Sequence, residues 1–276
     1  DLASEMFELA DEMAELTWDR WSDHALTSQT GCALAIELQI APAAVHADIS
    51  STLAQLVTEA EGAVSTGFLG TPLVLPALSR YNNMEAAYLM LLRTGVRSWL
   101  YQIANGATTV WERWDAILPD GSIHHGTMKD MDVTGGQESS EEVDLHEPHM
   151  LSFNHYAYGA VVDWIYRNVG GVSPDPQAPG YQHVVLAPRP CTAITSASTS
   201  IAAELGTVSL DWSVQDQVFV ADVVLPFGTS ATLRPPASSE STVTVNGQAE
   251  SSSPCDPIRL DYGHHRVEVH NPEVTP

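Results

Sequence analysis

Apolar and polar positions follow a helical period at the start of the chain. Apolar side chains recur at spacings of four and three, at Leu2, Met6, Leu9, Met13 and Leu16, and acidic residues fill much of the rest. This period predicts an amphipathic helix with one apolar stripe. We expect its acidic residues to form a solvated face rather than a surface for a partner.

Further short helices are predicted up to about residue 103. A proline disfavours helix at the residue before it, so Pro42 separates two of them. The predicted helices cover Ser28–Ile40, Ala43–Gly62, a short segment ending near Ser79, Met84–Arg93 and Val96–Ile103, with a glycine-rich break at Ser65–Pro72. Antiparallel helices joined by short loops indicate stacked helical hairpins, as in a bundle or an α/α toroid.

Residues Asn105–Met150 show weak periodicity and are rich in Gly, Asp, Glu, His and aromatic residues. Loops of this length in a compact domain are usually functional or disordered, and Gly135–Asp144 is predicted to be the mobile part. A helix is predicted to resume over Ser152–Val169 and to end at Gly170-Gly171.

The period changes after the proline-rich run from Pro174 to Pro190. Short segments rich in Val, Ile, Thr and Leu follow, separated by turn residues such as Asn246-Gly247. The predicted strands are His183–Leu186, Thr195–Ile201, Val208–Val214, Val218–Leu225, Ser230–Leu233, Thr242–Val245 and Arg266–Val269. Seven or eight strands at this spacing predict a small antiparallel β-sandwich. We therefore expect two domains, a helical one over 1–172 and a β-sandwich over 173–276.

The charge of the chain excludes several classes of partner. Eleven basic residues face 35 acidic ones among 276, which gives a net charge of −24. A chain this acidic is repelled by phosphate, so we expect no nucleic acid and no anionic membrane as partner. No apolar run approaches the ~20 residues that span a bilayer.

The beginning of the chain and its cysteines limit the remaining classes. The chain opens at Asp1 inside a predicted helix and without a signal-peptide pattern, so we expect a processed chain or a fragment. Three cysteines far apart in sequence exclude a disulfide-dense scaffold and a CxxC metal site. Localisation and oligomeric state stay open.

The segment Gly106–Asp115 holds the densest set of chemically useful side chains. Trp111, Glu112, Arg113, Trp114 and Asp115 are consecutive and follow a glycine-led turn. Tryptophan faces pack on the C–H faces of sugars, and a carboxylate between them can bind hydroxyls or activate water. The alternative is an ion pair between Glu112 and Arg113 beside ordinary core tryptophans.

Histidines form a second group of candidates. The spacing of His146 and His149 lacks the HExxH arrangement, and Pro148 breaks the helix that such a zinc motif needs. His155 is predicted on the first turn of the helix that starts at Ser152, where it could reach a pocket. The alternative is a buried histidine bonded to backbone.

The remaining candidates carry weaker signals. His124-His125 and His264-His265 are predicted to be surface or turn residues, and Asp115, Asp130 and Asp132 are possible second carboxylates. The sequence contains no GxSxG nucleophile elbow and no phosphate-binding loop, and no GxGxxG motif follows a predicted strand. The sequence therefore predicts neither a metal nor a cofactor.

Four segments resemble motifs of one enzyme family in the same order. Gly106-Ala-Thr-Thr-Val-Trp-Glu-Arg-Trp resembles the GATT-x-WE-x-W segment of bacterial and fungal α-L-rhamnosidases, which are inverting glycoside hydrolases with an (α/α)6 barrel. Ser152–Gly159 resembles their SxNHxxxG segment, and Gly171–Gly180 resembles their connection into a C-terminal β-sandwich. Thr66–Pro72 resembles their TGFxGTP loop, and Gln29-Thr30 at the start of a helix is also similar.

The resemblance implies a role for each matching residue. Glu112 would be the general base that activates water, His155 would line the rhamnose pocket, and Trp111 and Trp114 would shape that pocket. The substrate would be a rhamnose-containing glycoside or oligosaccharide. An inverting mechanism also needs an acid, which the family carries in an Asp/Glu-rich motif near the start of its barrel.

No segment of this chain matches that acidic motif. We therefore expect the chain to hold the C-terminal half of the barrel and the β-sandwich, with the base but without the acid, and to be weakly active or inactive alone. Such a half toroid would expose apolar helix faces. Two other hypotheses stay open, a non-catalytic sugar-binding fragment and a helical-barrel glycosidase acting on another sugar.

Overall fold

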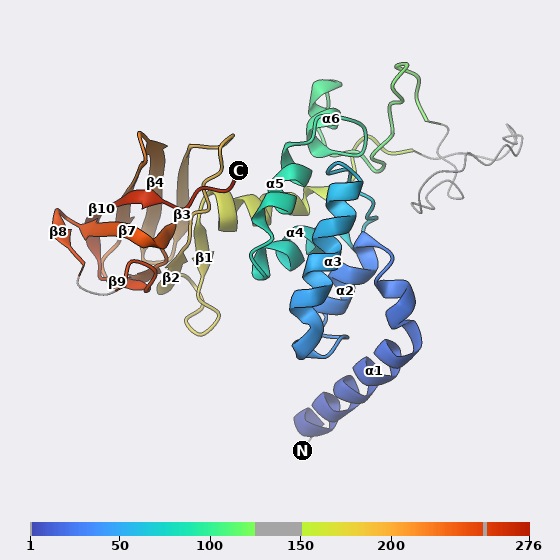
Figure 1. The fold of residues 1–276 in the computed structure, drawn as a ribbon, viewed down its shortest axis with the longest axis horizontal. Coiled ribbons are helices and arrows are strands. Elements are labelled where there is room, and N and C mark those ends of the chain that lie inside the picture. Colours follow the sequence, from blue (N-terminus) through green and yellow to red (C-terminus); the bar gives the residue numbers. More distant parts are fainter. Residues whose placement is uncertain (1, 125–150, 251–252) are drawn as a thin grey trace, which may run out of the picture. The chain divides into compact units, whose positions relative to one another are not determined.

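The structure, a computed structural model, describes residues 2–124, 151–250 and 253–276. The chain divides into two compact units, Asp1–Val161 and Val162–Pro276. The first unit is helical, and strands dominate the second (Figure 1). None of the helices in these described ranges combines the length and the apolar character that crossing a bilayer requires.

Helices of the first unit pack through small and branched apolar side chains. Its core is formed mainly by α2, α3, α4 and α5, with Ala33, Ile36, Leu53, Val74, Leu78 and Met90 among the buried residues. The helices are α1 (Leu2–Ala25), α2 (Gln29–Glu37), α3 (His46–Glu59), α4 (Thr71–Arg80), α5 (Met84–Leu92) and α6 (Trp99–Ala104), with a 3₁₀ turn at Ala43–Val45. The predicted series of short helices is thereby confirmed.

Helix α2 ends earlier than the sequence predicted. Ser28 caps its start by accepting a hydrogen bond from the backbone N–H of Gly31. At the other end Gln39 adopts a φ of 54°, and the N–H of Ala41 donates back to the carbonyl of Ala35 at 3.0 Å. This left-handed residue closes the helix at Glu37, before Pro42 exerts its own effect.

Helix α1 forms as predicted, yet it buries none of its residues. The apolar stripe is open to solvent, with Leu2 71 % and Leu16 62 % exposed. Figure 1 shows α1 extending away from the other helices of its unit. A stripe of this size is a large exposed apolar face for one helix.

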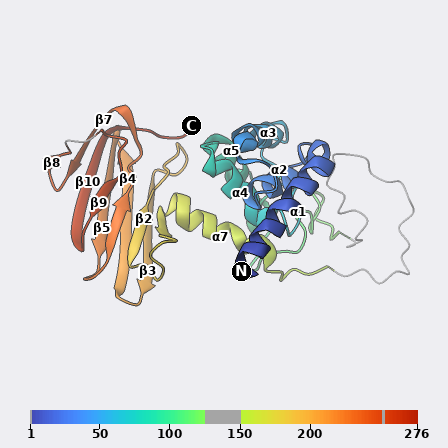
Figure 2. The same cartoon turned by 90° about the horizontal axis from the view of Figure 1, so that it is seen from below.

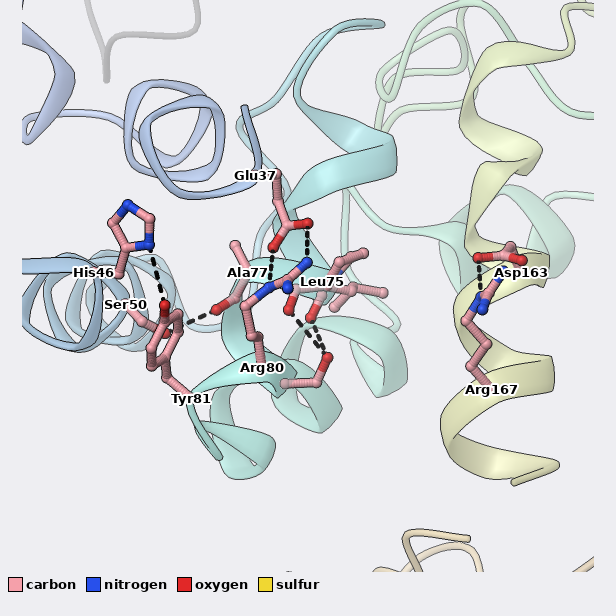
Figure 3. A network of polar contacts seen from close by, with 11 residues as sticks. Glu37, His46, Ser50, Leu75, Ala77, Arg80, Tyr81, Asp163 and Arg167 are labelled. Atoms are coloured by element: carbon pink, nitrogen blue, oxygen red, sulfur yellow. Dashed lines mark hydrogen bonds and ion pairs between the residues drawn. The ribbon is translucent and has the colours of Figure 1, made fainter. Parts of the chain in front are cut away.

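Polar side chains tie the helices of the first unit together (Figure 3). Arg80 at the end of α4 donates two hydrogen bonds to Glu37 at the end of α2, at 2.9 and 2.7 Å. The Ser50 hydroxyl of α3 donates to the carbonyl of Ala77 in α4 at 2.9 Å. These bonds fix α4 against α2 and α3.

The helix predicted from Ser152 is wrong over its first five residues. Helical structure begins with a 3₁₀ turn at Ala157–Ala160 and continues as α7 (Val161–Trp164) and a π-helical turn at Ile165–Val169. Before Ala157, backbone N–H groups such as those of Ser152 and His155 donate to a neighbouring segment instead of along a helix. His155 therefore lies on a loop and not on a first helical turn.

The second unit is a sandwich of two sheets (Figure 2). One sheet has the order β1-β2-β6-β9 and the other β3-β4-β5-β10-β7-β8. The strands are β1 (Val172–Pro174), β2 (His183–Leu186), β3 (Ser196–Ala203), β4 (Gly206–Gln215), β5 (Val218–Leu225), β6 (Ser230–Leu233), β7 (Ala237–Val245), β8 (Gln248–Ala249), β9 (Ile258–Leu260) and β10 (Gly263–Pro272). Buried residues from both sheets, such as Leu186, Leu210, Phe219 and Val267, form one core.

Strand pairing is antiparallel throughout this unit except between β2 and β6, which run parallel. The predicted turn at Asn246-Gly247 is confirmed, because both residues adopt positive φ, 52° and 77°, between the paired strands β7 and β8. His264 and His265, predicted as surface or turn residues, lie on strand β10, and His264 is exposed there as predicted.

Candidate active site

Two loops of the helical unit run beside each other at the candidate site. One follows α6 and carries Glu112, and the other precedes the 3₁₀ turn at Ala157–Ala160. The backbone N–H of Glu112 donates to the carbonyl of Ser152 at 2.9 Å, and that of His155 donates to the carbonyl of Val110 at 2.7 Å. These bonds bring together two segments that are about 40 residues apart in the sequence.

The Glu112 carboxylate is held at one of its two oxygens. Oε2 accepts a hydrogen bond from the backbone N–H of Ser152 at 2.7 Å, and the side chain is half-buried. Among the described residues, Ser152 is the hydrogen-bond donor to this carboxylate, and it bonds Oε2. A fixed, partly accessible carboxylate of this kind is suited to general-base chemistry.

The ion pair considered from the sequence joins Arg113 to Glu112, whereas the structure shows Arg113 paired with Asp115. Its guanidinium is buried and pairs with the Asp115 carboxylate, Nε to Oδ1 at 3.0 Å and Nη2 to Oδ2 at 3.3 Å. The Nε2 atom of His124 lies 3.3 Å from the same Nη2. His124 is therefore part of a half-buried polar network and not a surface residue as predicted.

Trp111 directly precedes Glu112 in the sequence, and its side chain is 3 % exposed. Its backbone N–H donates to Oε1 of the buried Gln102 on α6 at 3.2 Å. The indole packs edge-to-face on Phe153, with 5.4 Å between ring centroids. The buried indole thus packs under the loop that carries Glu112.

Trp114 is anchored by three contacts and is 5 % exposed. Its indole N–H donates to the carbonyl of Thr66 at 2.8 Å. The ring stacks on Tyr158 with centroids 3.9 Å apart and meets Trp99 edge-to-face at 5.2 Å. Trp114 therefore joins the three segments that the sequence singled out separately, around Thr66, Glu112 and Tyr158.

The His155 imidazole stacks face-to-face on Phe68, with centroids 4.3 Å apart and an angle of 12° between planes. Phe68 belongs to the glycine-rich loop between α3 and α4 and also contacts Tyr158. Neither Phe68 nor Tyr158 was assigned a role from the sequence. Their only signal was their presence in two of the quoted motifs.

The Gln29 side chain holds the backbone just before the glycine-rich loop Thr66–Pro72. Its side chain is 2 % exposed, donates through Nε2 to the carbonyl of Ala63 at 3.0 Å and accepts at Oε1 from the N–H of Ser65 at 2.8 Å. A buried amide with both ends bonded is a strong constraint on the backbone it holds. The similarity at Gln29-Thr30 thus has a structural explanation.

Several candidates from the sequence lie outside the described residues. These are His125, Asp130, Asp132, His146 and His149, together with the segment Gly135–Asp144. Within the described part of the chain, no three His, Cys, Asp or Glu side chains are grouped so that they could hold a metal ion. Cys32, Cys191 and Cys255 are free thiols.

Burial raises the pKa of the Tyr158 phenol to about 12, and the carboxylates of Asp115 and Glu112 act in the same direction. Burial also raises the pKa of the Cys32 thiol to about 11. Both groups bind their proton more tightly in the folded chain than in the unfolded chain, where the ordinary values are 10.0 and 9.0. Their contribution to stability is complete below pH 9 and is lost as the pH rises toward 12.

We therefore expect the chain to lose stability in alkaline solution. Urea unfolding at pH 8 and pH 11 should show a fall in unfolding free energy, with each group contributing on the order of 2 kcal/mol at most. Tyr158→Phe should reduce the part of the fall that occurs above pH 10 and leave the part due to Cys32. An unfolding free energy equal at both pH values would contradict the burial of these groups.

Helical hairpins with a half-buried glutamate flanked by tryptophans, followed by a β-sandwich, are the arrangement with which the chain was compared. Residues 11–169 match the profile of the bacterial alpha-L-rhamnosidase 6 hairpin glycosidase domain. Residues 171–250 match that of the bacterial alpha-L-rhamnosidase C-terminal domain. The chain belongs to the bacterial α-L-rhamnosidase family.

Known relatives agree with this assignment. An alpha-L-rhamnosidase of Streptomyces avermitilis is 33 % identical over 244 residues, which are 88 % of this chain and 21 % of that protein. One from Alteromonas sp. is 30 % identical over 223 residues, 81 % of this chain and 22 % of the relative. The chain thus spans about a fifth of the length of the curated relatives it matches.

Solved structures of α-L-rhamnosidases are also similar to this chain over most of its length. The Streptomyces avermitilis enzyme, whose crystal structure was determined in complex with L-rhamnose, matches 88 % of this chain with a TM-score of 0.72 and 32 % identity, and 21 % of its own chain is covered. The α-L-rhamnosidase of Aspergillus terreus matches 88 % of this chain with a TM-score of 0.69 and 30 % identity, over 24 % of its own chain.

Proposed function

We propose that this chain is the part of an α-L-rhamnosidase that carries the general base, and that the whole enzyme hydrolyses terminal non-reducing α-L-rhamnose residues with inversion. The single observation that carries the proposal is the state of Glu112. It lies in a segment matched by the glycosidase profile, is half-buried, and is held at Oε2 by the Ser152 N–H. Residues 1–172 would supply half of the barrel and 173–276 the β-sandwich.

The proposed reaction begins with a water molecule beside Glu112. Oε1 takes a proton from the water as its oxygen attacks the anomeric carbon from the face opposite the leaving group. The glycosidic C–O bond breaks, and the leaving oxygen takes a proton from a general acid. In inverting enzymes that acid stands roughly 6.5–9.5 Å from the base. We assign the acid to a segment of the enzyme that this chain does not contain.

We propose that the sugar binds next to the Glu112 carboxylate. His155 would donate or accept a hydrogen bond to a sugar hydroxyl, and its stack on Phe68 would fix the plane of its imidazole. Trp111 and Trp114 would shape the pocket from behind, since both are buried. The net charge of −24 suits a neutral sugar, because a neutral substrate is not repelled.

The configuration of the first product tests the inverting mechanism. A full-length rhamnosidase that carries this chain should release β-L-rhamnose from a 4-nitrophenyl α-L-rhamnoside, and the anomeric proton should show this in ¹H NMR spectra taken before mutarotation. A parallel reaction with pre-equilibrated rhamnose supplies the reference spectrum. Initial release of α-L-rhamnose would show retention and would contradict the inverting mechanism.

A non-catalytic sugar-binding fragment is the second candidate, because the chain spans about a fifth of its relatives. The complete enzyme separates the two, because Glu112→Gln should abolish rhamnose release there if the chain supplies the base and leave it unchanged if the chain only binds sugar. Calorimetry with L-rhamnose should detect binding by this chain in the second case.

A further inference from the structure

A concave site lies on the second unit, apart from Glu112. It has a volume of about 310 Å³, which is in the range of small-molecule pockets. The helical turns before the sandwich form one wall, and strands β1 and β3 form the other. Val172, Pro174 and Ile201 give it an apolar floor, and Tyr166 and Tyr181 line it as well.

The charged groups of this cavity form an ion pair with no net charge. Arg167 donates through Nε to Oδ2 of Asp163 at 2.7 Å, one helical turn away (Figure 3). Among the described residues the recorded bonds of this pair use only these two atoms. The amino groups of Arg167 and Oδ1 of Asp163 therefore remain as donors and acceptor for a ligand.

Tyr181 is held in an unfavourable backbone conformation at this position. Its φ is 60°, and it is the one aromatic residue among the described non-glycine residues with positive φ. Its ring packs partly against the sandwich core while also lining the cavity. Such an outlier persists only when its surroundings favour the side chain at that place.

The charge and the side chains of the cavity lining indicate which class of ligand it could bind. The Asp163–Arg167 pair carries no net charge, so the cavity has no surplus charge for an ion, and a chain of net charge −24 repels anions. Two tyrosine rings with a donor group and an acceptor group beside them suit a compact molecule with apolar C–H faces and several hydroxyls. A neutral pyranoside has both properties.

We propose that this cavity, lined by Tyr166, Tyr181, Asp163 and Arg167, is an accessory binding site for a single neutral sugar residue. The site is separate from Glu112 and requires no catalysis. It would hold a sugar of a glycan chain on the β-sandwich unit. Because one aromatic pair and a few hydrogen bonds act alone here, binding is expected in the millimolar range.

Titration by NMR tests the site on the complete chain. ¹H–¹⁵N spectra recorded with methyl α-L-rhamnopyranoside up to about 100 mM should show saturable shifts for residues around 162–174 and 199–201. Tyr166→Ala and Arg167→Gln should each weaken this binding about tenfold, the size expected for one aromatic or charged contact. Tyr166 and Arg167 are both exposed, so neither variant should unfold the chain.

Two controls keep this site distinct from other surfaces. Tyr262→Ala removes a similarly exposed tyrosine, which packs on Phe227 in the same unit, and should leave the titration unchanged. Glu112→Gln should also leave it unchanged, so a failure of the proposed catalysis does not affect the result. Sodium glucuronate, an anionic sugar, should bind more weakly.

Three results would overturn the proposal. They are the absence of saturable shifts in this region, a dissociation constant that is unchanged in Tyr166→Ala, and shifts that disappear in Tyr262→Ala. The last would assign sugar binding to the aromatic pair Phe227–Tyr262 instead.

Discussion

Replacing Glu112 by glutamine should lower rhamnose release by about 10²- to 10⁴-fold in a full-length rhamnosidase that carries this chain. The amide oxygen of glutamine can still accept the hydrogen bond that Ser152 N–H donates to Oε2 at 2.7 Å. The substitution therefore keeps the position of the side chain and removes its ability to take a proton from water. Hydrolysis of an aryl α-L-rhamnoside at saturating substrate gives the effect on kcat.

Glu61→Gln is the matched control, because the Glu61 side chain is 87 % exposed and lies on a different loop. It should leave the rate unchanged. Glu112→Ala with added azide gives a second readout, since azide attacks without a base and should restore cleavage as the β-rhamnosyl azide. Activity of Glu112→Gln within tenfold of the unchanged enzyme would show that another group is the base.

Replacing Trp114 by alanine should cost this chain about 3–5 kcal/mol of unfolding free energy. The substitution removes a buried indole that stacks on Tyr158, contacts Trp99 and donates to the carbonyl of Thr66. It leaves a cavity and an unpaired buried carbonyl at the junction of three loops. Urea unfolding followed by circular dichroism measures the loss.

A smaller change keeps this test informative if Trp114→Ala does not fold. Trp114→Phe retains a ring against Tyr158 and loses the bond to Thr66, so a cost of about 1–2 kcal/mol is expected. Trp21→Ala is the control, because Trp21 is 52 % exposed on α1, and it should change stability by less than about 0.5 kcal/mol. A Trp114→Ala chain as stable as the Trp21→Ala chain would rule out the anchoring role.

The local pattern of apolar and polar residues was sufficient to predict most helices and strands. Strands Val218–Leu225 and Ser230–Leu233 have their predicted bounds, because alternation and flanking turn residues both mark them. The strands that were missed, β1, β8 and β9, are two or three residues long and carry too few positions for a period. Their pairing depends on the sheet around them.

The loop before Ala157 shows where local pattern fails. Ser152–Tyr156 continues into a helix in sequence, yet its backbone groups bond to residues 110–112, which no local window contains. The same limit applies to Arg113, whose two neighbouring carboxylates are both plausible partners by sequence. Only the three-dimensional arrangement selects Asp115.

Composition and motifs predicted the members of the candidate site better than their contacts. Glu112, His155, Trp111 and Trp114 were named from the sequence; the structure brings their segments together, and their roles stay predictions. The side chains that hold them, Phe68, Tyr158 and Gln29, were not assigned, because support between distant segments leaves no periodic signal.

The paired bonds between Glu112 and Ser152 close the stretch between these two residues at its base. They join the two backbones and one carboxylate oxygen, so they depend on no side chain of the residues in between. Because the entropy of closing a loop grows only slowly with its length, the number of residues in between adds little to the cost of holding the Glu112 carboxylate beside the Ser152 N–H.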